Sequence, residues 1–173
     1  MRGAVIGGSA GALDALNALL CALPPVTDTS LFVVIHITPT ADSLLPAAIG
    51  AYTAMPVREA VDKLRIDAGI IVVAPPDYHM LIERDLTVSL SRDAHVHFSR
   101  PAIDSLFETA AFTFGARGIG VLLSGGNADG AMGLVAIRAA GGKVAVQTPD
   151  SSTSPQMARA ALAALTPQLE GAP

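Results

Sequence analysis

Short apolar runs rich in β-branched residues alternate along this chain with longer stretches whose apolar residues repeat at the period of a helix. The pattern predicts strands over 3–7, 31–37, 69–75, 118–125 and 143–148, and helices near 11–23, 42–53, 101–115, 129–141 and 154–165. Such alternation is typical of a mostly parallel sheet with helices on both faces. We therefore predict a doubly wound α/β fold, a Rossmann-like three-layer sandwich.

One region departs from this alternation. The runs "HMLIER" (79–84) and "LTVSLSR" (86–92) alternate apolar and polar residues on either side of Asp85, which predicts an antiparallel hairpin that extends the sheet or flanks the site. No linker or repeat divides the chain, so we expect residues 1–173 to form a single domain with a core over about 3–166. The end, "TPQLEGAP", is expected to be a frayed tail.

Composition excludes several function classes. Charged residues make up 15% of the chain, the net charge is -4, and no basic cluster is present, so we expect no nucleic-acid partner. Glycine and polar residues interrupt the apolar N-terminal stretch, and no uninterrupted apolar run reaches about 18 residues. We therefore expect a cytoplasmic protein without direct membrane insertion. The single cysteine, Cys21 in "LLCAL", is expected to be a buried structural thiol.

The segment "VIGGSAGALDAL" places Ser9 in a glycine turn between the first strand and the first helix. Three functions fit a serine there: capping the helix, binding a phosphate at its N-terminus, or acting as the nucleophile of a G-x-S-x-G turn. The dinucleotide pattern G-x-G-x-x-G is not met, and no acidic residue ends the second strand. The turn alone leaves the three alternatives open.

Two further residues lie at the ends of predicted strands. His36 closes the second strand, and Asp129 lies in the small-residue loop "LLSGGNADGAMG" (122–133) that ends the fourth parallel strand. Taken singly, His36 reads as a structural histidine and Asp129 as a helix cap. Because the carboxyl ends of parallel strands share one edge of the sheet, Ser9, His36 and Asp129 are expected to meet there as a nucleophile, a base and an orienting acid.

Several segments, in the same order, resemble the catalytic domain of the chemotaxis protein-glutamate methylesterases, the CheB-type enzymes that also deamidate receptor glutamines. They are "IGGSAGALDAL", "VVIHITPTADSLLP", "VREAVDKLRIDAGIIVVAPPDYHMLI", "HFSRPAIDSLFETAA" and "LLSGGNADGAMGL". The resemblance implies a serine ester hydrolase with Ser9 as nucleophile, His36 as base and Asp129 as its orienting residue. It implies no cofactor, and a methylated chemoreceptor or similar signalling protein as substrate.

Two alternatives to this enzyme remain at this point. An ordinary α/β-hydrolase carries its triad in the order serine, acid, histidine, whereas no histidine follows Asp129 here. An inactive or phosphate-binding signalling module on the same fold is the other. The family's receiver domain has no counterpart ahead of Met1, so a stand-alone catalytic domain is expected. The sequence gives no indication of the oligomeric state.

Other residues could complete the site. The backbone amides of Ala10 and Gly126 are expected to form the oxyanion hole, although some relatives carry threonine and methionine at these positions. Arg100 is predicted either to hold acidic substrate groups or to be a solvated arginine. His79, His95 and His97 lack the spacing of a metal-ligand set, so we predict no metal site.

Overall fold

The computed structural model describes residues 1–36 and 44–170, with side chains up to Thr166. Within this part of the chain, six parallel strands form one sheet in the order β3-β4-β2-β1-β7-β8. The strands are β1 (Arg2–Gly8), β2 (Thr29–Ile35), β3 (Val57–Glu59), β4 (Ile71–Val73), β7 (Gly118–Leu122) and β8 (Lys143–Val146). The α/β fold class predicted from the sequence is confirmed.

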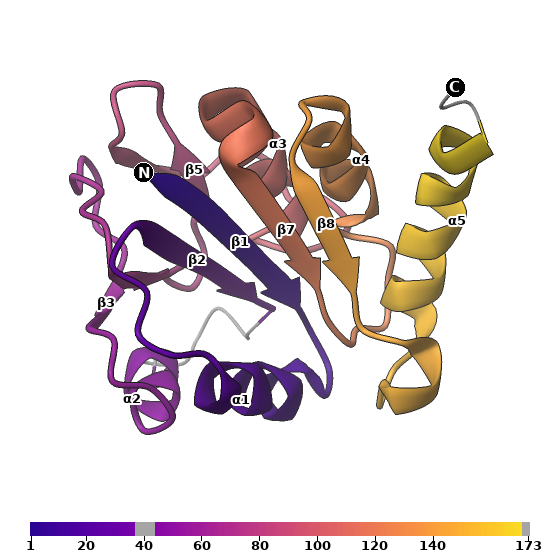
Figure 1. Cartoon of the computed structure of the whole chain (residues 1–173), viewed down its shortest axis with the longest axis horizontal. Helices are drawn as coiled ribbons and strands as arrows, with labels where there is room; N and C mark the ends of the chain where they lie inside the picture. Colours follow the sequence, from indigo (N-terminus) through magenta and orange to yellow (C-terminus); the bar gives the residue numbers. More distant parts are fainter. Residues whose placement is uncertain (37–43, 171–173) are drawn as a thin grey trace.

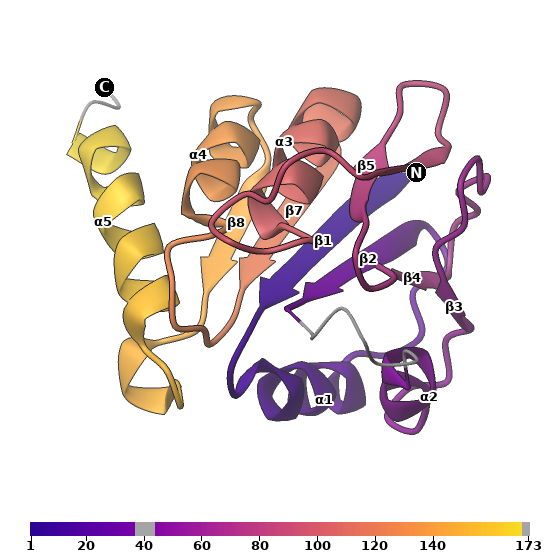
Figure 2. The ribbon, with the colours of Figure 1, turned by 180° about the vertical axis from the view of Figure 1, so that it is seen from behind.

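Helices cover both faces of the sheet (Figures 1 and 2). One face packs against α1 and α2, and the other against α3, α4, α5 and a separate hairpin of β5 and β6. The bounds are α1 (Ala12–Ala22), α2 (Leu45–Gly50), β5 (His79–Ile82), β6 (Val88–Ser91), α3 (Ile103–Phe114), α4 (Ala131–Ala139) and α5 (Gln156–Glu170), with short 3-10 turns at Gly115–Arg117 and Pro149–Ser151.

Strand β2 shows why this sequence forms a covered parallel sheet. All seven of its residues are buried, and its side chains alternate between the two faces. Phe32 and Val34 join the core under α3, while Val33 and Ile35 join the core under α1. A continuous apolar run is what a strand buried on both faces requires.

The hairpin prediction is confirmed, but β5 and β6 form their own two-stranded sheet rather than extending the main one. The three-residue edge strand β3 was not predicted, because so short a run carries little periodicity. Helix α5 continues to Glu170, past its expected end. Residue 37 of the expected second strand and residues 42 and 43 of the expected second helix lie outside the described residues.

The expectation of a buried Cys21 is wrong, since this thiol is exposed. Helix α1 turns Ala12, Leu16 and Leu20 toward the sheet, and a residue that directly follows Leu20 is rotated by about 100° away from that stripe. None of the helices in the described residues combines the length and apolar character needed to cross a membrane.

Candidate active site

The turn that carries Ser9 is fixed by its backbone. Strand β1 ends at Gly8, and α1 begins after Gly11, which has the left-handed φ of 76° that glycine tolerates. The Ser9 amide donates to the Ser124 carbonyl at 2.8 Å, and the Ser9 carbonyl accepts from the Ala12 amide at 3.0 Å. Gly11 occupies the N-cap position of α1, and no side chain caps this helix. The helix-capping alternative for Ser9 is therefore wrong.

Ser124 holds this turn from the neighbouring strand end. Its side chain is fully buried, donates to the Ala10 carbonyl at 2.7 Å and accepts from the Ser154 amide at 2.9 Å. A Cβ added at Gly11 would overlap the side chain of Thr153, so the segment before α5 also packs directly against the turn. These contacts fix the backbone of the turn, and Ser9 is partly exposed to solvent.

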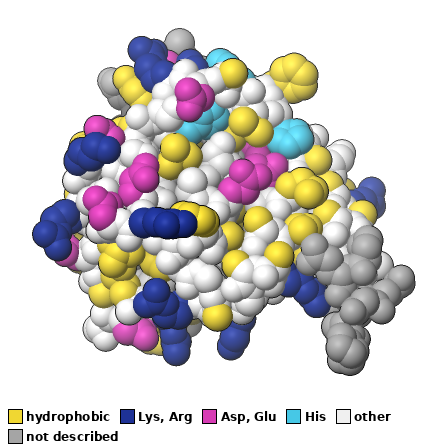
Figure 3. Space-filling view, turned by 90° about the horizontal axis from the view of Figure 1, so that it is seen from above, with side chains coloured by type: hydrophobic (Ala, Val, Ile, Leu, Met, Phe, Trp, Pro, Cys, Tyr) yellow, Lys and Arg dark blue, Asp and Glu magenta, His cyan; other side chains and the backbone are white. Residues whose placement is uncertain are grey.

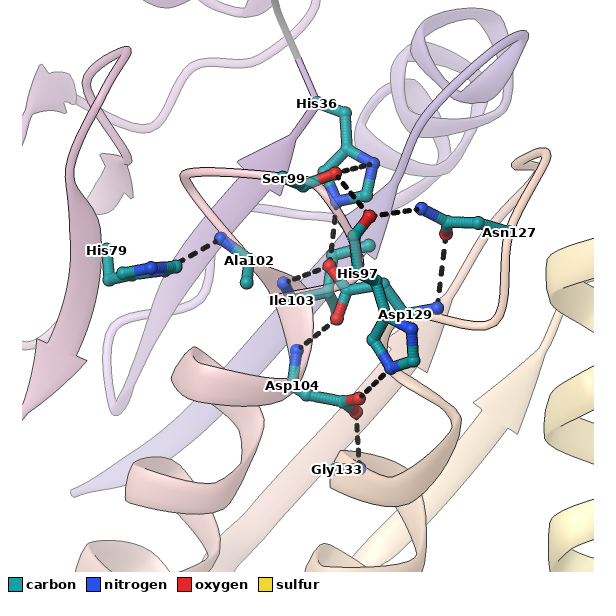
Figure 4. Close-up of polar contacts among 10 residues, drawn as sticks. All are labelled: His36, His79, His97, Ser99, Ala102, Ile103, Asp104, Asn127, Asp129 and Gly133. Atoms are coloured by element: carbon teal, nitrogen blue, oxygen red, sulfur yellow. Dashed lines mark hydrogen bonds and ion pairs between the residues drawn. The ribbon is translucent and has the colours of Figure 1, made fainter. Parts of the chain in front are cut away.

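His36 lies beside this turn. Gly8 of β1 is paired with Ile35 of β2, and the His36 amide donates to the Gly8 carbonyl at 3.0 Å, so Ser9 and His36 are the next residues of two adjacent parallel strands. Such strands run about 4.8 Å apart. The side chain of His36 is only 12% exposed, and its Nε2 lies 2.8 Å from Oδ2 of Asp129 (Figure 4).

Asp129 is fully buried and uses both carboxylate oxygens. Oδ2 accepts from the Ile103 amide at 2.7 Å as well as facing His36, and Oδ1 accepts from the Asp104 amide at 2.8 Å. These two amides belong to the first turn of α3, whose N–H groups have no partner within their own helix. The interpretation of Asp129 as a helix cap is therefore correct in kind, but the helix that it caps is α3 and not α4, which follows it in the sequence. The same contacts fix the carboxylate against His36.

The second ring nitrogen of His36 faces a different serine. Its Nδ1 lies 3.3 Å from Oγ of Ser99 (Figure 4). Within residues 1–36 and 44–170, the structure gives the Ser9 hydroxyl no hydrogen bond to His36. In the structure, His36 therefore contacts Asp129 through Nε2 and Ser99 through Nδ1. Ser9 lies at the end of the adjacent strand.

Two amides predicted for the oxyanion hole are open. Among the described residues, neither the Ala10 nor the Gly126 amide donates to a protein acceptor, whereas that of Ser9 is used by Ser124. A Cβ at Gly126 would meet nothing within 4 Å, so the space on that side of its Cα is open. Both amides are available to a developing negative charge.

A second polar network adjoins Asp129. Oδ1 of Asp104 accepts from the Gly133 amide at 2.7 Å, in the first turn of α4, and Oδ2 lies 3.3 Å from Nε2 of His97. Burial raises the pKa of the Asp104 carboxyl. The ligand atoms of His97, Asp104 and Asp129 lie within 4.8 Å of one another, a group that the sequence spacing did not indicate. Their oxygens already accept N–H donors, so the geometry favours a capping network over a metal site.

Arg100 is bound within the protein. Its guanidinium donates to Asp77 through Nε at 3.0 Å and Nη2 at 2.6 Å, and through Nη1 to the carbonyls of Arg92 and Asp93 at 3.0 Å. Hydrogen bonds from Arg92 and Arg100 lower the pKa of the Asp77 carboxyl. Neither alternative predicted for Arg100, a substrate ligand or a solvated side chain, matches these contacts, because the residue ties the loop before α3 to Asp77.

The other predicted histidines divide between core and surface. His79 is buried, and its ring has a structural role: Nδ1 accepts from the Ala102 amide and Nε2 contacts the Ala94 carbonyl. His95 is exposed.

On the face shown in Figure 3, histidine side chains lie beside acidic ones, and Lys and Arg side chains are spread over the surface rather than gathered.

Two residues of this site were missed from the sequence. Ser124 is the second residue after β7, so the rule that selected Ser9 and His36 at strand ends would also have selected it. Ser99 follows no strand of the main sheet. Its only sequence signal is a hydroxyl in the loop that leads into α3.

The chain is similar over most of its length to proteins of one family. The family model described as CheB methylesterase matches residues 4–170. A Leptospira interrogans protein named as a protein-glutamate methylesterase/protein-glutamine glutaminase is 41% identical over 160 residues, which cover 92% of this chain and 83% of the relative. A Methanosarcina acetivorans protein of the same name is 34% identical, over 84% of this chain and 43% of the relative.

A solved structure is also similar. The catalytic domain of Thermotoga maritima CheB methylesterase superimposes with a TM-score of 0.88 and 25% sequence identity, over 94% of this chain and 87% of that one. These comparisons do not favour the alternative of a phosphate-binding module.

Proposed function

The chain belongs to the CheB methylesterase family, and from this premise we propose that it hydrolyses the methyl esters of glutamate side chains through Ser9, His36 and Asp129. The observation that carries the proposal is the contact of His36 with a buried carboxylate, at the sheet edge where the Ser9 turn ends the adjacent strand. A base oriented by an acid beside a serine turn is the arrangement of an acyl-transfer site.

In the proposed reaction, the Ser9 hydroxyl attacks the ester carbonyl and gives its proton to Nδ1 of His36, the nitrogen that does not face Asp129. The tetrahedral oxyanion accepts hydrogen bonds from the Ala10 and Gly126 amides, and loss of one such donor costs about 10²–10³ in rate in other enzymes. Methanol leaves with the proton from His36. Water then attacks the acyl-enzyme, with His36 again as base, and releases the glutamate carboxylate.

The same steps applied to a glutamine side chain would release ammonia, which is the second activity in the names of the relatives. We infer a methylated chemoreceptor or similar signalling protein as the substrate. We also propose that this protein meets its substrate in the cytoplasm. The exposed thiol of Cys21 suits a reducing compartment.

Covalent labelling tests the nucleophile. The protein is treated with a serine-reactive fluorophosphonate, and the modified peptide is mapped by mass spectrometry. We expect modification at Ser9 in the wild-type protein, and at least a hundredfold slower modification in His36→Gln, since an activated serine needs its base. A label elsewhere, or a rate that His36→Gln leaves unchanged, would overturn the assignment.

A further inference from the structure

Ser99 lies in a tight turn whose backbone is strained. The Val96 amide donates to the Ser99 carbonyl at 3.2 Å and the Ser99 amide to the Val96 carbonyl at 2.9 Å, which closes the turn around His97 and Phe98. These two central residues have φ values of 50° and 62°. Bulky L-residues rarely adopt positive φ, and such conformations persist only where surrounding contacts hold them.

The contacts that hold the turn are polar and lead to the site. The ring of His97 pairs with Asp104, and the His97 carbonyl accepts from Nδ2 of Asn127 at 3.4 Å (Figure 4). The Phe98 side chain is completely exposed, so packing of its ring does not hold the turn. The strained turn is therefore anchored to the loop of Asp129 and to α3, with Ser99 directed at His36.

The tautomer of His36 follows from its two neighbours. Nε2 faces a carboxylate that already accepts two amide donors, so this nitrogen carries the hydrogen. In the neutral ring Nδ1 is then the acceptor, with one lone pair, and the Ser99 hydroxyl is its donor. Ser9 must give its proton to this same nitrogen, so the two serines compete for one acceptor.

Ser99 also has a second acceptor within reach. Its Oγ lies 3.4 Å from the His97 carbonyl, compared with 3.3 Å from Nδ1 of His36. A hydroxyl has one hydrogen, which it can donate to only one of these acceptors at a time. Rotation of the hydroxyl toward the His97 carbonyl would release Nδ1 and still leave the Ser99 hydrogen bonded.

We infer that Ser99 is a positioning residue that occupies Nδ1 of His36 in the resting protein and yields it to Ser9 for the reaction. This inference rests on the proposed function of Ser9 and His36. The ring of His36 is oriented between Asp129 and Ser99. When Ser99 leaves Nδ1, its hydroxyl can donate to the His97 carbonyl instead, so little hydrogen-bond energy is lost. The consequence is that Ser99 slows the activation of Ser9 when no substrate is bound.

The test compares Ser99→Ala and Ser99→Thr with a matched control, Ser89→Ala, whose hydroxyl bonds Glu83 on the β5–β6 hairpin. The first readout is the rate of Ser9 modification by a fluorophosphonate. We expect Ser99→Ala to react roughly two- to tenfold faster than wild type, the factor that corresponds to releasing one neutral hydrogen bond. Ser99→Thr keeps a hydroxyl and should react more slowly than Ser99→Ala, and Ser89→Ala should match wild type.

The second readout is the ¹⁵N NMR spectrum of the His36 ring, which needs no activity. In the wild-type protein at a pH where the ring is neutral, we expect a protonated Nε2 and a bare Nδ1, and Ser99→Ala should shift the Nδ1 resonance while leaving Nε2 unchanged. An unchanged or slower labelling rate in Ser99→Ala, a label on Ser99 itself, or a protonated Nδ1 in wild type would overturn the inference. Absence of any label at Ser9 would instead overturn the proposed function, and the NMR spectrum would still decide whether Ser99 holds Nδ1.

Discussion

Replacing Asp129 by Asn should destabilise the protein as well as inactivate it. The wild-type carboxylate accepts three donors, namely the amides of Ile103 and Asp104 and the ring of His36. An Asn side chain has one oxygen, and its NH₂ group would have to face at least one of these donors. A perturbation that looks isosteric therefore breaks a buried network, because Asp129 has no exposed surface through which water could compensate.

The expected cost follows from the lost contacts. A hydrogen bond to a charged group contributes about 1.5–3 kcal/mol, and a negative charge at a helix N-terminus about 0.3–1 kcal/mol, up to ~2 when partly buried. Together these give a loss of about 2–5 kcal/mol in the free energy of unfolding, against a total of about 5–15 kcal/mol for a typical domain. With a urea m-value of about 2 kcal/mol/M, the middle of the usual range, the unfolding midpoint should fall by roughly 1–2.5 M.

Urea unfolding followed by circular dichroism measures this loss, with Ser9→Ala as the matched control. Ser9 lies on a partly exposed turn, and in the described residues its hydroxyl supports no other group, so its replacement should leave the midpoint near that of wild type. If Asp129→Asn unfolds at the wild-type midpoint, the account of Asp129 as the cap of α3 is refuted, whatever happens to activity.

Three other outcomes are expected. Ser124→Ala would leave the Ala10 carbonyl and the Ser154 amide without their partner, and each should lower the free energy of unfolding by about 1–3 kcal/mol. The same variant should slow hydrolysis, and an unchanged rate of hydrolysis would contradict the role of Ser124 at the turn. Gly11→Ala should cost about 1–3 kcal/mol because φ is positive, with further loss from overlap with Thr153; thermal unfolding checks this. Burial raises the pKa of Asp104, so the folded protein binds this proton more tightly than the unfolded chain, and stability should fall as the pH rises from about 4 through the raised pKa. Asp104→Asn should flatten that part of the pH profile, and an identical slope in both proteins would refute the assignment.

The positions after the strands were predictable because they depend on local pattern and on one rule of topology. Apolar β-branched runs indicated β1, β2 and β7, and the carboxyl ends of parallel strands meet at one edge, which placed Ser9, His36 and Asp129 together. The contact of His36 with Asp129, 93 residues apart, follows from that rule.

Contacts made by loops were not predictable in the same way. Ser99 and His36 are 63 residues apart in the sequence, and their contact depends on the conformation of the strained turn after the hairpin. No periodicity of apolar residues predicts that conformation. The same is true of Arg100, whose partner Asp77 lies on the other side of the hairpin. Cys21 was wrongly predicted to be buried because its neighbours in the sequence are apolar, although its position on α1 points away from the buried face of the helix.

Methanol release from a chemoreceptor fragment carrying glutamate methyl esters tests the central claim most directly. The purified protein is compared with Ser9→Ala after both are shown to have the same circular dichroism spectrum and unfolding midpoint. The account predicts enzyme-dependent methanol release by the wild-type protein and none above background by Ser9→Ala. Release at an equal rate by a correctly folded Ser9→Ala protein, or no release by the wild type from any methylated fragment, would contradict it.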